Sequence, residues 1–352
     1  MSLKYAAPAL AAALLFGAST PLAKVLGAEL PPILLAGLLY LGSGLGLAAV
    51  LVMRRAAGLA EEARGATLAI PRKDIPWLAG AIVAGGVFGP ALLMAGLATT
   101  DAAPAALLLN VEGVLTAVIA WLVFKENADR QIVLGMAAIV AGGVLLSWQP
   151  GAARLSSGAL LIIGACLCWA IDNNLTRKVS ANDALVMACL KGVLAGTVNT
   201  SLGLLAGAHL PPPGPLAATL VVGLAGYGLS LVLFVVALRS LGTSRTGAYF
   251  SVAPLFGVLI AFALWPQVPS WSFWGAAALM VAGVWLHLRE RHDHLHTHRP
   301  MAHVHRHTHD EHHQHHHDFP WDGTSPHVHP HQHAAVTHQH AHFPDIHHRH
   351  PH

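Results

Sequence analysis

A single carboxylate stands near the middle of a long apolar stretch that runs from residue 102 to residue 124. This residue is Glu112, and the nearest charges are Asp101 and Lys125, which flank the stretch. A helix of this length spans the hydrocarbon core of a bilayer, where a carboxylate is costly unless it is protonated, paired or facing a wet cavity. We interpret Glu112, with Thr116 one turn further on the same face, as a proton-carrying group in a transport pathway. The alternative is a protonated acid that is hydrogen-bonded inside a helix bundle.

A second set of polar side chains is predicted to meet between two later helices. Asp172, which is followed by Asn173, lies five residues before Arg177, or about 7–8 Å from the end of its helix at 1.5 Å per residue. Lys191 lies eight residues after Asp183, which puts it about 12 Å deep by the same rise. These depths predict an ion pair between Asp172 and Lys191. The alternative is that each side chain reaches the interface separately, the lysine by snorkelling.

Pro254 occupies the position of Glu112 in a second copy of the same apolar pattern. A proline removes one backbone hydrogen bond, here to the carbonyl of Phe250, and kinks the helix. Broken helices near the midplane expose backbone polar groups in transporters, whereas a kink that only serves packing is the alternative. Aromatic and small polar groups line ligand sites, and the candidates for such a lining are Phe16, Trp169, Tyr227, Tyr249 and Ser251.

The composition excludes a soluble protein. Of the 352 residues, 54% are hydrophobic and 11% are charged, whereas soluble domains carry about 25% charged residues. The net charge of +3 does not indicate a nucleic-acid partner. The three cysteines lie in apolar stretches and are interpreted as buried thiols. Neither a nucleophile–base arrangement nor a phosphate-binding motif is visible, so we expect no enzymatic activity and no required cofactor.

Ten apolar stretches have the length and composition of membrane spans. With the N-terminus in the cytoplasm, twelve Lys and Arg residues fall in inside loops and two, Lys24 and Arg154, fall outside. Because positive charge gathers on the cytoplasmic side, we expect a bacterial-type inner membrane protein with both termini in the cytoplasm. The predicted spans are about residues 5–26, 32–53, 76–98, 102–124, 130–148, 157–177, 183–206, 215–238, 246–265 and 270–289.

The two halves of the chain repeat one another. Residues 16–20 align with residues 169–173 at an offset of 153. Because each half holds five spans, an odd number, the second half enters the membrane upside down. Such inverted repeats frame a site near the midplane and open it alternately to each side. We therefore expect an all-α membrane protein of ten transmembrane helices, with one five-helix repeat over residues 1–150 and its inverted copy over residues 151–291.

The chain resembles the EamA-type members of the drug/metabolite transporter superfamily over residues 5–290. The resemblance rests on the Phe-Gly-small-small start of the first span, on GVLTAVIAWLVFKE and on AGGVLL near the end of the first half, which have counterparts in the second. It implies two five-helix halves and transport of a small solute. The family usually has Pro where this chain has Glu112, so the resemblance assigns no role to that residue.

The segment from residue 292 to residue 352 has a different composition, since it contains 24 of the 26 histidines. With little to bury, it is expected to be a disordered cytoplasmic tail. Imidazoles bind Zn²⁺, Ni²⁺ and Co²⁺, so the tail could buffer or sense such metals; the alternatives are a pH-sensitive polycation or a low-complexity segment without a role. The candidate metal ligands are His292, His294, His296, His298, His303, His305, His307 and His309.

These observations predict a secondary-active transporter that exports or exchanges a small polar metabolite by alternating access. No ATP site is visible, so a gradient, for example of protons, would supply the driving force. One alternative is an exporter of Zn, Ni or Co ions that uses the tail; another is a membrane-embedded enzyme or scaffold, against which the inverted repeat argues. The expected partners are the lipid bilayer and the small-molecule substrate, without nucleic acid, and the chain is expected to be a monomer or a homodimer.

Overall fold

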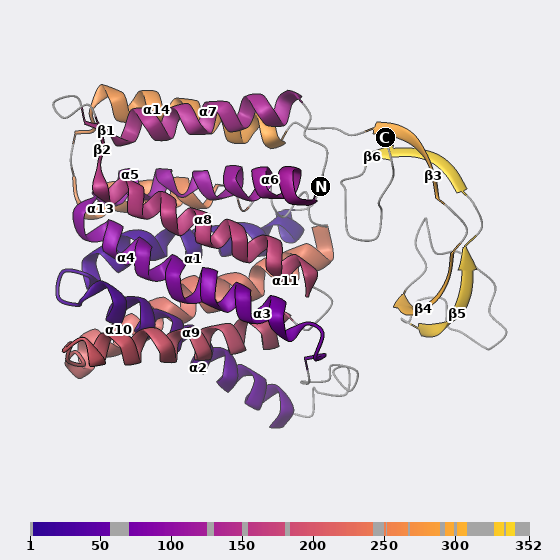
Figure 1. Cartoon of the computed structure of the whole chain (residues 1–352), viewed down its shortest axis with the longest axis horizontal. Helices are drawn as coiled ribbons and strands as arrows, with labels where there is room; N and C mark the ends of the chain where they lie inside the picture. Colours follow the sequence, from indigo (N-terminus) through magenta and orange to yellow (C-terminus); the bar gives the residue numbers. More distant parts are fainter. Residues whose placement is uncertain are drawn as a thin grey trace. The chain divides into compact units, whose positions relative to one another are not determined.

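The computed structural model describes the chain except for residues 1–2, 57–69, 125–129, 150–153, 180–183, 242–249, 251, 267, 289–292, 299–300, 308–326, 334–335 and 342–352. Two compact units are present, Met1–Arg289 and Glu290–His352, and each is described by itself. The first unit is a bundle of helices (Figure 1). Its sequence favours helices because a chain in lipid must satisfy its backbone hydrogen bonds internally.

The helices of the first unit follow the predicted apolar stretches closely. The first half contains α1 (Leu3–Leu26), α2 (Pro32–Ala56), α3 (Ile75–Ala81), the π-helix η2 (Ile82–Phe88), α4 (Gly89–Thr99), α5 (Ala102–Leu108), α6 (Asn110–Phe124) and α7 (Arg130–Ser147). The second half contains α8 (Ser157–Lys178), α9 (Ala184–Leu205), α10 (Pro213–Gly223), the π-helix η3 (Leu224–Leu229), α11 (Ser230–Leu241), α13 (Ala253–Leu264) and α14 (Trp271–Leu288). The short antiparallel strands β1 (Trp148–Gln149) and β2 (Arg154–Leu155) join the halves.

Within the described residues, seven helical segments are long and apolar enough to cross a membrane. They are Ala7–Leu26, Pro32–Arg54, Ile75–Thr99, Ala102–Val123, Ser157–Thr176, Leu185–Leu205 and Pro213–Phe234. Three shorter apolar helices cover Val133–Leu146, Ala253–Leu264 and Trp271–Leu286. The prediction of a multi-pass helical membrane protein is confirmed, while a crossing by each of the three shorter helices stays a prediction.

The helices of the two halves pack in a reciprocal pattern. The second helices, α2 and α9, pack against each other, as do the fifth helices, α7 and α14, which Figure 1 shows side by side at the top. Helix α1 packs against α11 and α13 of the second half, and α8 packs against α4 and α6 of the first. A duplicated chain is expected to pack in this way, because each contact then has a counterpart in which the halves exchange roles.

Small residues allow the backbones of α2 and α9 to approach closely. A Cβ atom added at Gly192 of α9 would lie 2.6 Å from the Cα atom of Gly44 in α2. Real Cβ atoms do not pack at that distance, so even alanine at Gly192 would push the two helices apart. Close approach through small residues is a common way for helices to associate in membranes, where the lipid provides no hydrophobic driving force.

The stretch around Glu112 differs from the single continuous helix that the sequence predicts. Helix α5 ends at Leu108 and α6 begins at Asn110, so the helix is interrupted at Leu109. The side chain of Asn110 donates a 2.9 Å hydrogen bond to the carbonyl of Leu107, and such local side-chain bonds compete with helical backbone bonds. Glu112 therefore lies in the first turn of α6.

Pro254 also lies in a first turn, and this corrects the predicted mid-helix kink. Helix α13 begins at Ala253 and has Pro254 at one of its first two positions. The first turn of a helix tolerates proline because its N–H groups have no partner within the helix. Glu112 and Pro254 thus both follow closely on the start of a helix in their respective halves.

Each half also contains a π-helix, which the sequence analysis does not predict. Both lie in the third long segment of their half, η2 between α3 and α4 and η3 between α10 and α11. Their starts, Ile82 and Leu224, are 142 residues apart, the same offset that separates Glu112 from Pro254. Single π-helical turns are rare and are frequently found at functional sites.

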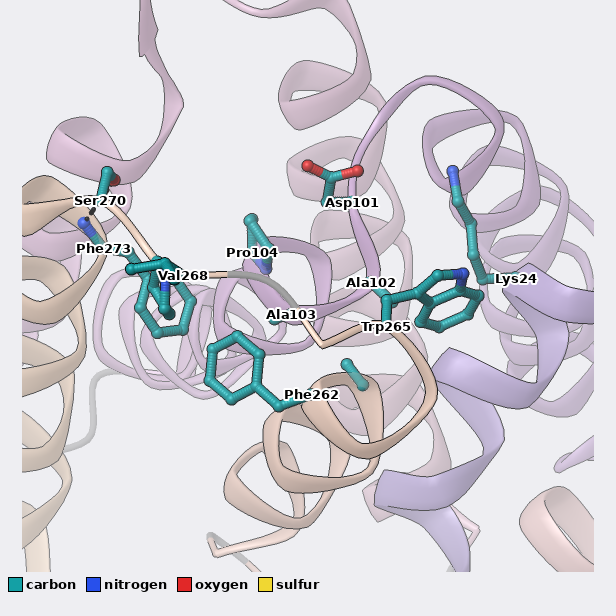
Figure 2. Close-up of a pocket in the computed structure, with 12 residues that line it drawn as sticks. Lys24, Asp101, Ala102, Ala103, Pro104, Phe262, Trp265, Val268, Ser270 and Phe273 are labelled. Atoms are coloured by element: carbon teal, nitrogen blue, oxygen red, sulfur yellow. Dashed lines mark hydrogen bonds between the residues drawn. The ribbon is translucent and has the colours of Figure 1, made fainter.

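A pocket of about 300 Å³ lies at one end of the bundle (Figure 2). Its walls come from the last turn of α1, the start of α5, the end of α13 and the residues that lead into α14. It joins residues from the first half of the helical unit to residues from the second half.

Among its described residues the second unit contains four strands, where the sequence predicts a disordered tail. Strand β3 (Asp293–His298) pairs with β6 (Val336–Ala341), and β4 (Met301–His307) pairs with β5 (His327–His333), both antiparallel. The physical reason is the His-x-His alternation, since its two-residue period is that of a β-strand. The register places histidine opposite histidine, for example His296 opposite His338 and His305 opposite His329.

Candidate functional site

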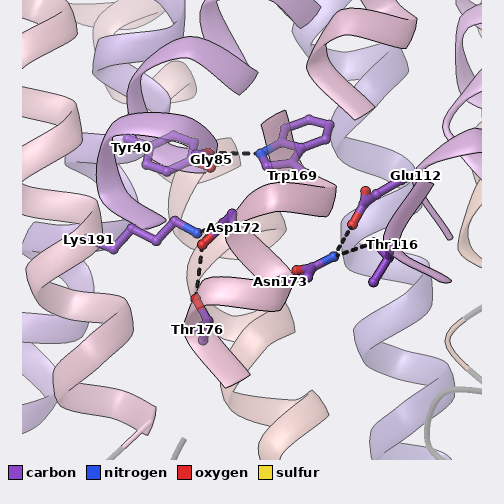
Figure 3. A network of polar contacts seen from close by, with 9 residues as sticks. All are labelled: Tyr40, Gly85, Glu112, Thr116, Trp169, Asp172, Asn173, Thr176 and Lys191. Atoms are coloured by element: carbon purple, nitrogen blue, oxygen red, sulfur yellow. Dashed lines mark hydrogen bonds and ion pairs between the residues drawn. The ribbon is translucent and has the colours of Figure 1, made fainter. Parts of the chain in front are cut away.

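The candidate site is a layer of polar side chains around α8. Trp169, Asp172, Asn173 and Thr176 follow one another at spacings of three, one and three residues, so they lie on neighbouring faces of this helix. Figure 3 shows Asp172 directed toward Lys191 and the adjacent Asn173 directed toward α6. Helix α8 therefore presents a carboxylate to one side and an amide to the other.

The predicted pairing of Asp172 with Lys191 is confirmed. The ammonium group of Lys191, on α9, donates to Oδ2 of Asp172 and forms an ion pair with it. The other oxygen, Oδ1, accepts a 3.0 Å hydrogen bond from the hydroxyl of Thr176. The side chain of Asp172 is 5% exposed and that of Lys191 is 22% exposed, so the carboxylate is buried while the ammonium retains some access.

Glu112 has an amide partner across the interface between α6 and α8. The side-chain nitrogen of Asn173 lies 2.9 Å from Oε1 of Glu112 and 3.3 Å from the hydroxyl of Thr116, and it donates to both. The neighbouring Asn174 donates to the backbone carbonyl of Thr116 at 3.2 Å. The prediction that Glu112 and Thr116 share a face is confirmed by this common partner. An amide donor can bond the carboxyl group whether or not the latter carries a proton.

The π-helix η2 supplies backbone carbonyls to the same region. The carbonyl of Gly85 accepts two hydrogen bonds, each 2.9 Å long, from the hydroxyl of Tyr40 and from the indole nitrogen of Trp169 (Figure 3). The side chain of Asn199 donates to the carbonyls of Gly86 at 3.3 Å and Val87 at 3.2 Å. A π-helix displaces carbonyls from the regular α-helical ladder, and here side chains of α2, α8 and α9 bond to them.

Gly85 also makes room for the buried carboxylate. A Cβ atom added at this glycine would overlap the carboxyl group of Asp172. At Gly89, a Cβ atom would lie 2.9 Å from the indole nitrogen of Trp169. The ion pair and the indole thus pack directly onto the backbone of η2 and the start of α4, so a movement of one requires a movement of the other.

An aromatic chain connects this region to the second half. The ring of Tyr40 lies 5.3 Å from that of Tyr227 in η3, and Tyr227 lies 6.1 Å from Phe16 in an edge-to-face arrangement. Phe16 in turn lies 5.5 Å from Phe250. The predicted lining residues Phe16 and Tyr227 therefore pack on each other, and Tyr40 links the two π-helices.

Several predicted site residues lie elsewhere or outside the described part of the chain. Pro254 is on α13, which packs against α1 and α5, so it is not part of the hydrogen-bonded layer. Tyr249 and Ser251 lie outside the described residues. Tyr40 and Asn199 are not among the predicted site residues, although a tyrosine and an asparagine inside apolar helices are signals that could have indicated them.

The candidate metal ligands of the tail fall on the strands or beyond them. His294, His296 and His298 lie on β3, and His303, His305 and His307 lie on β4. His292 and His309 are outside the described residues. Among the residues whose side chains are described, no group of three or more His, Cys, Asp or Glu is arranged to hold a metal ion.

A bundle of long apolar helices, with ionisable and amide side chains paired inside it, defines an integral, multi-pass membrane protein. Residues 4–148 and 156–289 each match the EamA-like transporter family, and the chain belongs to that family. The resemblance to the drug/metabolite transporters is thereby confirmed. Since the family and the relatives described next are transporters, the chain is a transporter rather than an enzyme.

Three relatives illustrate the similarity. An uncharacterized transporter of Methanothermobacter thermautotrophicus is 27% identical over 285 residues, which are 78% of this chain and 83% of that protein. The uncharacterized transporter YyaM of Bacillus subtilis is 24% identical over 56% of this chain and 68% of its own length. A probable terminal-alkyne amino-acid exporter of Streptantibioticus cattleyicolor is 26% identical over 61% of this chain and 73% of its own length.

A solved structure shares the fold. A crystal structure of another protein aligns with a TM-score of 0.57 and covers 80% of this chain and 95% of that one. At 21% sequence identity, this likeness concerns the fold alone.

Proposed function

We propose that this protein is a secondary-active transporter that exports or exchanges a small polar metabolite by alternating access, coupled to protons. In this proposal all ten apolar helices cross the inner membrane, the halves are inverted copies, and both termini are cytoplasmic. The reciprocal packing of α1 with α11 and α13, and of α8 with α4 and α6, supports the duplication. Inverted halves can exchange conformations, and this exchange opens a central site to each side in turn.

The observation that carries the proposal is the polar layer around α8. Three ionisable groups, Glu112, Asp172 and Lys191, lie around α8 inside helices that otherwise hold few charges. Ionisable residues within membrane helices are costly and mark substrate paths and proton relays. Of the three, Glu112 has a neutral amide as its hydrogen-bond partner and forms no ion pair among the described residues. It is therefore the group best suited to gain and lose a proton during transport.

Amino acids are the substrate class to test first. The layer contains carboxylates for an ammonium group and an ammonium for a carboxylate, which complement a zwitterion. The name of the Streptantibioticus relative, a probable exporter of a terminal-alkyne amino acid, points to the same class. In this proposal Lys191 leaves Asp172 and pairs with the carboxylate of the substrate. Glu112 releases its proton and then pairs with the ammonium group of the substrate.

The test combines binding and transport by the purified full-length protein. A thermal-shift screen of amino acids, nucleosides, sugars and divalent metals identifies ligands, because a ligand that binds the native state raises its melting temperature. Hits are then followed as radiolabelled solutes in proteoliposomes with an imposed pH gradient. We expect an amino acid to stabilise the protein and to accumulate against its gradient when protons flow the other way. Stabilisation by metals alone, or accumulation unaffected by the pH gradient, would contradict the proposal.

A further inference from the structure

The pocket at the end of the bundle carries two opposite charges that the polar layer does not use. Lys24 stands in the last turn of α1 and Asp101 stands directly before α5, and both line the pocket. Figure 2 shows the charged groups of both residues above the rings of Trp265 and Phe262 in that view. The pocket volume of about 300 Å³ is at the lower limit for sites of small ligands.

The two charges are available to a ligand. The ammonium of Lys24 donates to the backbone carbonyl of Leu97, which anchors the side chain and leaves its other N–H groups unassigned. The carboxylate of Asp101 precedes α5 but makes no capping hydrogen bond, and the residue is exposed. Between Lys24 and Asp101 no ion pair is formed in the described structure. The ammonium of Lys24, which is held in place, and the carboxylate of Asp101, which has no described partner, therefore line the same pocket.

The walls of the pocket are aromatic and apolar. Phe262 and Trp265 come from the end of α13, and Phe273 comes from α14. The faces of such rings attract ammonium groups and pack on small apolar side chains. The pocket thus offers an anion, a cation and an apolar surface, which are the three complements of an α-amino acid.

We propose that this pocket is a second binding site, specific for small zwitterionic α-amino acids, at the mouth of the transport pathway. Lys24 binds the substrate carboxylate, Asp101 binds its ammonium, and the side chain lies against Trp265 and Phe262. The inference rests on the proposed function, because it places a substrate at the end of the bundle that the predicted orientation puts outside. It goes beyond that function by adding a station that the substrate occupies before or after the central layer.

The ammonium-bearing headgroup of phosphatidylethanolamine offers the same chemistry, since it also carries an ammonium beside an anion. We therefore test the pocket in nanodiscs of phosphatidylglycerol, which has no ammonium, and in nanodiscs that contain phosphatidylethanolamine. Val268 lines the pocket and is 98% exposed, so Val268→Cys introduces an accessible thiol. The matched control is Ala28→Cys, an exposed position just beyond the end of α1 that is not part of the pocket lining.

The measurement is the rate at which a maleimide modifies each introduced thiol, with L-alanine, propionate or ethylamine as the probe. Labelling of Val268→Cys should slow as L-alanine is added, and the slowing should reach half of its maximum at a concentration equal to Kd, because half of the pockets are then occupied. Propionate and ethylamine, each with one of the two charges, should protect much less at the same concentration. Labelling of Ala28→Cys should not change with any of them.

The charged residues are then removed one at a time in the Val268→Cys background. Lys24→Gln and Asp101→Asn should each abolish protection by L-alanine, whereas Glu29→Gln, an exposed residue of the same turn region, should preserve it. An unchanged labelling rate without ligand, together with an unchanged melting temperature, shows that a variant is folded. Equal protection by propionate and L-alanine, or protection only by phosphatidylethanolamine, would overturn the proposal.

The measurements distinguish failure of the second-site proposal from failure of the proposed transport function. Glu112→Gln should leave the protection of Val268→Cys intact, since Glu112 does not line the pocket. Transport without protection would remove this second site and leave the transporter proposal standing. Protection without any amino-acid transport would keep the site and remove the proposed substrate.

Discussion

The first helices of the two halves, α1 and α8, each pack against a π-helix, but the side chains at the contact differ in charge. Ser19 of α1 packs against Gly226 of η3, where an added Cβ would lie 2.5 Å from the Cβ of the serine. Asp172 of α8 packs in the same way against Gly85 of η2, and the alignment at offset 153 makes Ser19 and Asp172 equivalent. One geometry therefore holds a neutral hydroxyl in one half and a buried carboxylate in the other.

The partners of these residues diverge as well. By the alignment of residues 32–44 with 184–196, Lys191 corresponds to Leu39, a buried residue of the first half. The hydroxyl of Ser19 donates to the carbonyl of Phe16 at 2.7 Å within its own helix, whereas Asp172 bonds across to α9. The duplication thus gives both halves the same scaffold, and Asp172 and Lys191 have no charged counterparts at the equivalent positions of the first half. Because the first half packs in the same way without these charges, we predict that the charge at α8 serves transport rather than folding.

The largest expected effect comes from breaking the charged pair on one side. Asp172→Ser alone leaves Lys191 without its counterion, and removal of one partner of a buried pair costs about 3–5 kcal/mol. We expect a loss of about 3 kcal/mol, at the low end of that range, because the lysine side chain is 22% exposed. Thermal unfolding of the purified variants measures the loss.

The double variant Asp172→Ser with Lys191→Leu copies the first half and should recover much of that stability. If the charges serve transport, the double variant should fold and reach the membrane but fail to accumulate substrate. Additive destabilisation in the double variant would mean that the two residues do not interact, and full transport would place their function elsewhere.

The glycines of the two π-helices should respond next most strongly. Gly85→Ala forces a methyl group into the Asp172 carboxylate and should cost about 1–3 kcal/mol, the usual range for an overpacked core. In Gly226→Ala the added methyl group meets Ser19 in the same way. The half whose variant loses more stability is the one whose helices adjust less to the added methyl group. The matched control is Gly113→Ala, because a Cβ atom there meets nothing within 4 Å. A destabilised control, or a harmless Gly85→Ala, would contradict this account of the packing.

Removal of single donors to the Gly85 carbonyl should have a smaller effect. Tyr40→Phe and Trp169→Phe each delete one of its two hydrogen bonds, and a single bond contributes about 0.5–1.5 kcal/mol. In either variant the remaining donor still satisfies the carbonyl. The double variant leaves the carbonyl unpaired and should therefore lose more than the sum of the two, which denaturation of the three proteins measures. Strict additivity would indicate that the carbonyl finds another partner.

The smallest effect on transport is expected from removal of the histidine-rich segment. Residues 290–352 form a unit distinct from the helical one, so a chain that ends at Arg291 should insert, fold and transport at an unchanged rate. It should lose most of its affinity for immobilised nickel, because 24 of the 26 histidines are removed. Loss of transport, together with a response of the full-length protein to Zn²⁺ or Ni²⁺, would favour a metal exporter instead.

The depth of a residue along its helix could be predicted from the sequence better than the neighbouring helix that its side chain contacts. The pairing of Asp172 with Lys191 could be predicted, because a fixed rise per residue converts position into depth and opposite charges at one depth attract. The bond from Asn173 to Glu112 could not, since it depends on how α6 is rotated toward α8. The interruption at Leu109 and the two π-helices were not predicted either. A π-helix adds a single residue to a turn and leaves the apolar pattern of the sequence almost unchanged.

For the histidine-rich tail, two features of the sequence favour different structures. Its composition indicated that it has no apolar core, which led to the prediction of disorder. The structure nevertheless pairs β3 with β6 and β4 with β5, and the alternation of histidines with other residues was the available signal. Composition and periodicity thus pointed in different directions, and the prediction followed composition.

The central claim is that Glu112 couples protons to substrate movement, and Glu112→Gln tests it most directly. Glutamine keeps the size of the side chain and can still bond to Asn173, but it cannot titrate. Purified variant and wild-type proteins would be compared in proteoliposomes by gradient-driven accumulation, by its pH dependence and by counterflow exchange, with Glu29→Gln as the control. We predict that Glu112→Gln folds, loses accumulation and flattens the pH dependence, while counterflow persists if Glu112 carries only the proton and vanishes if it also binds substrate. Normal accumulation by Glu112→Gln with an unchanged pH response would contradict the claim.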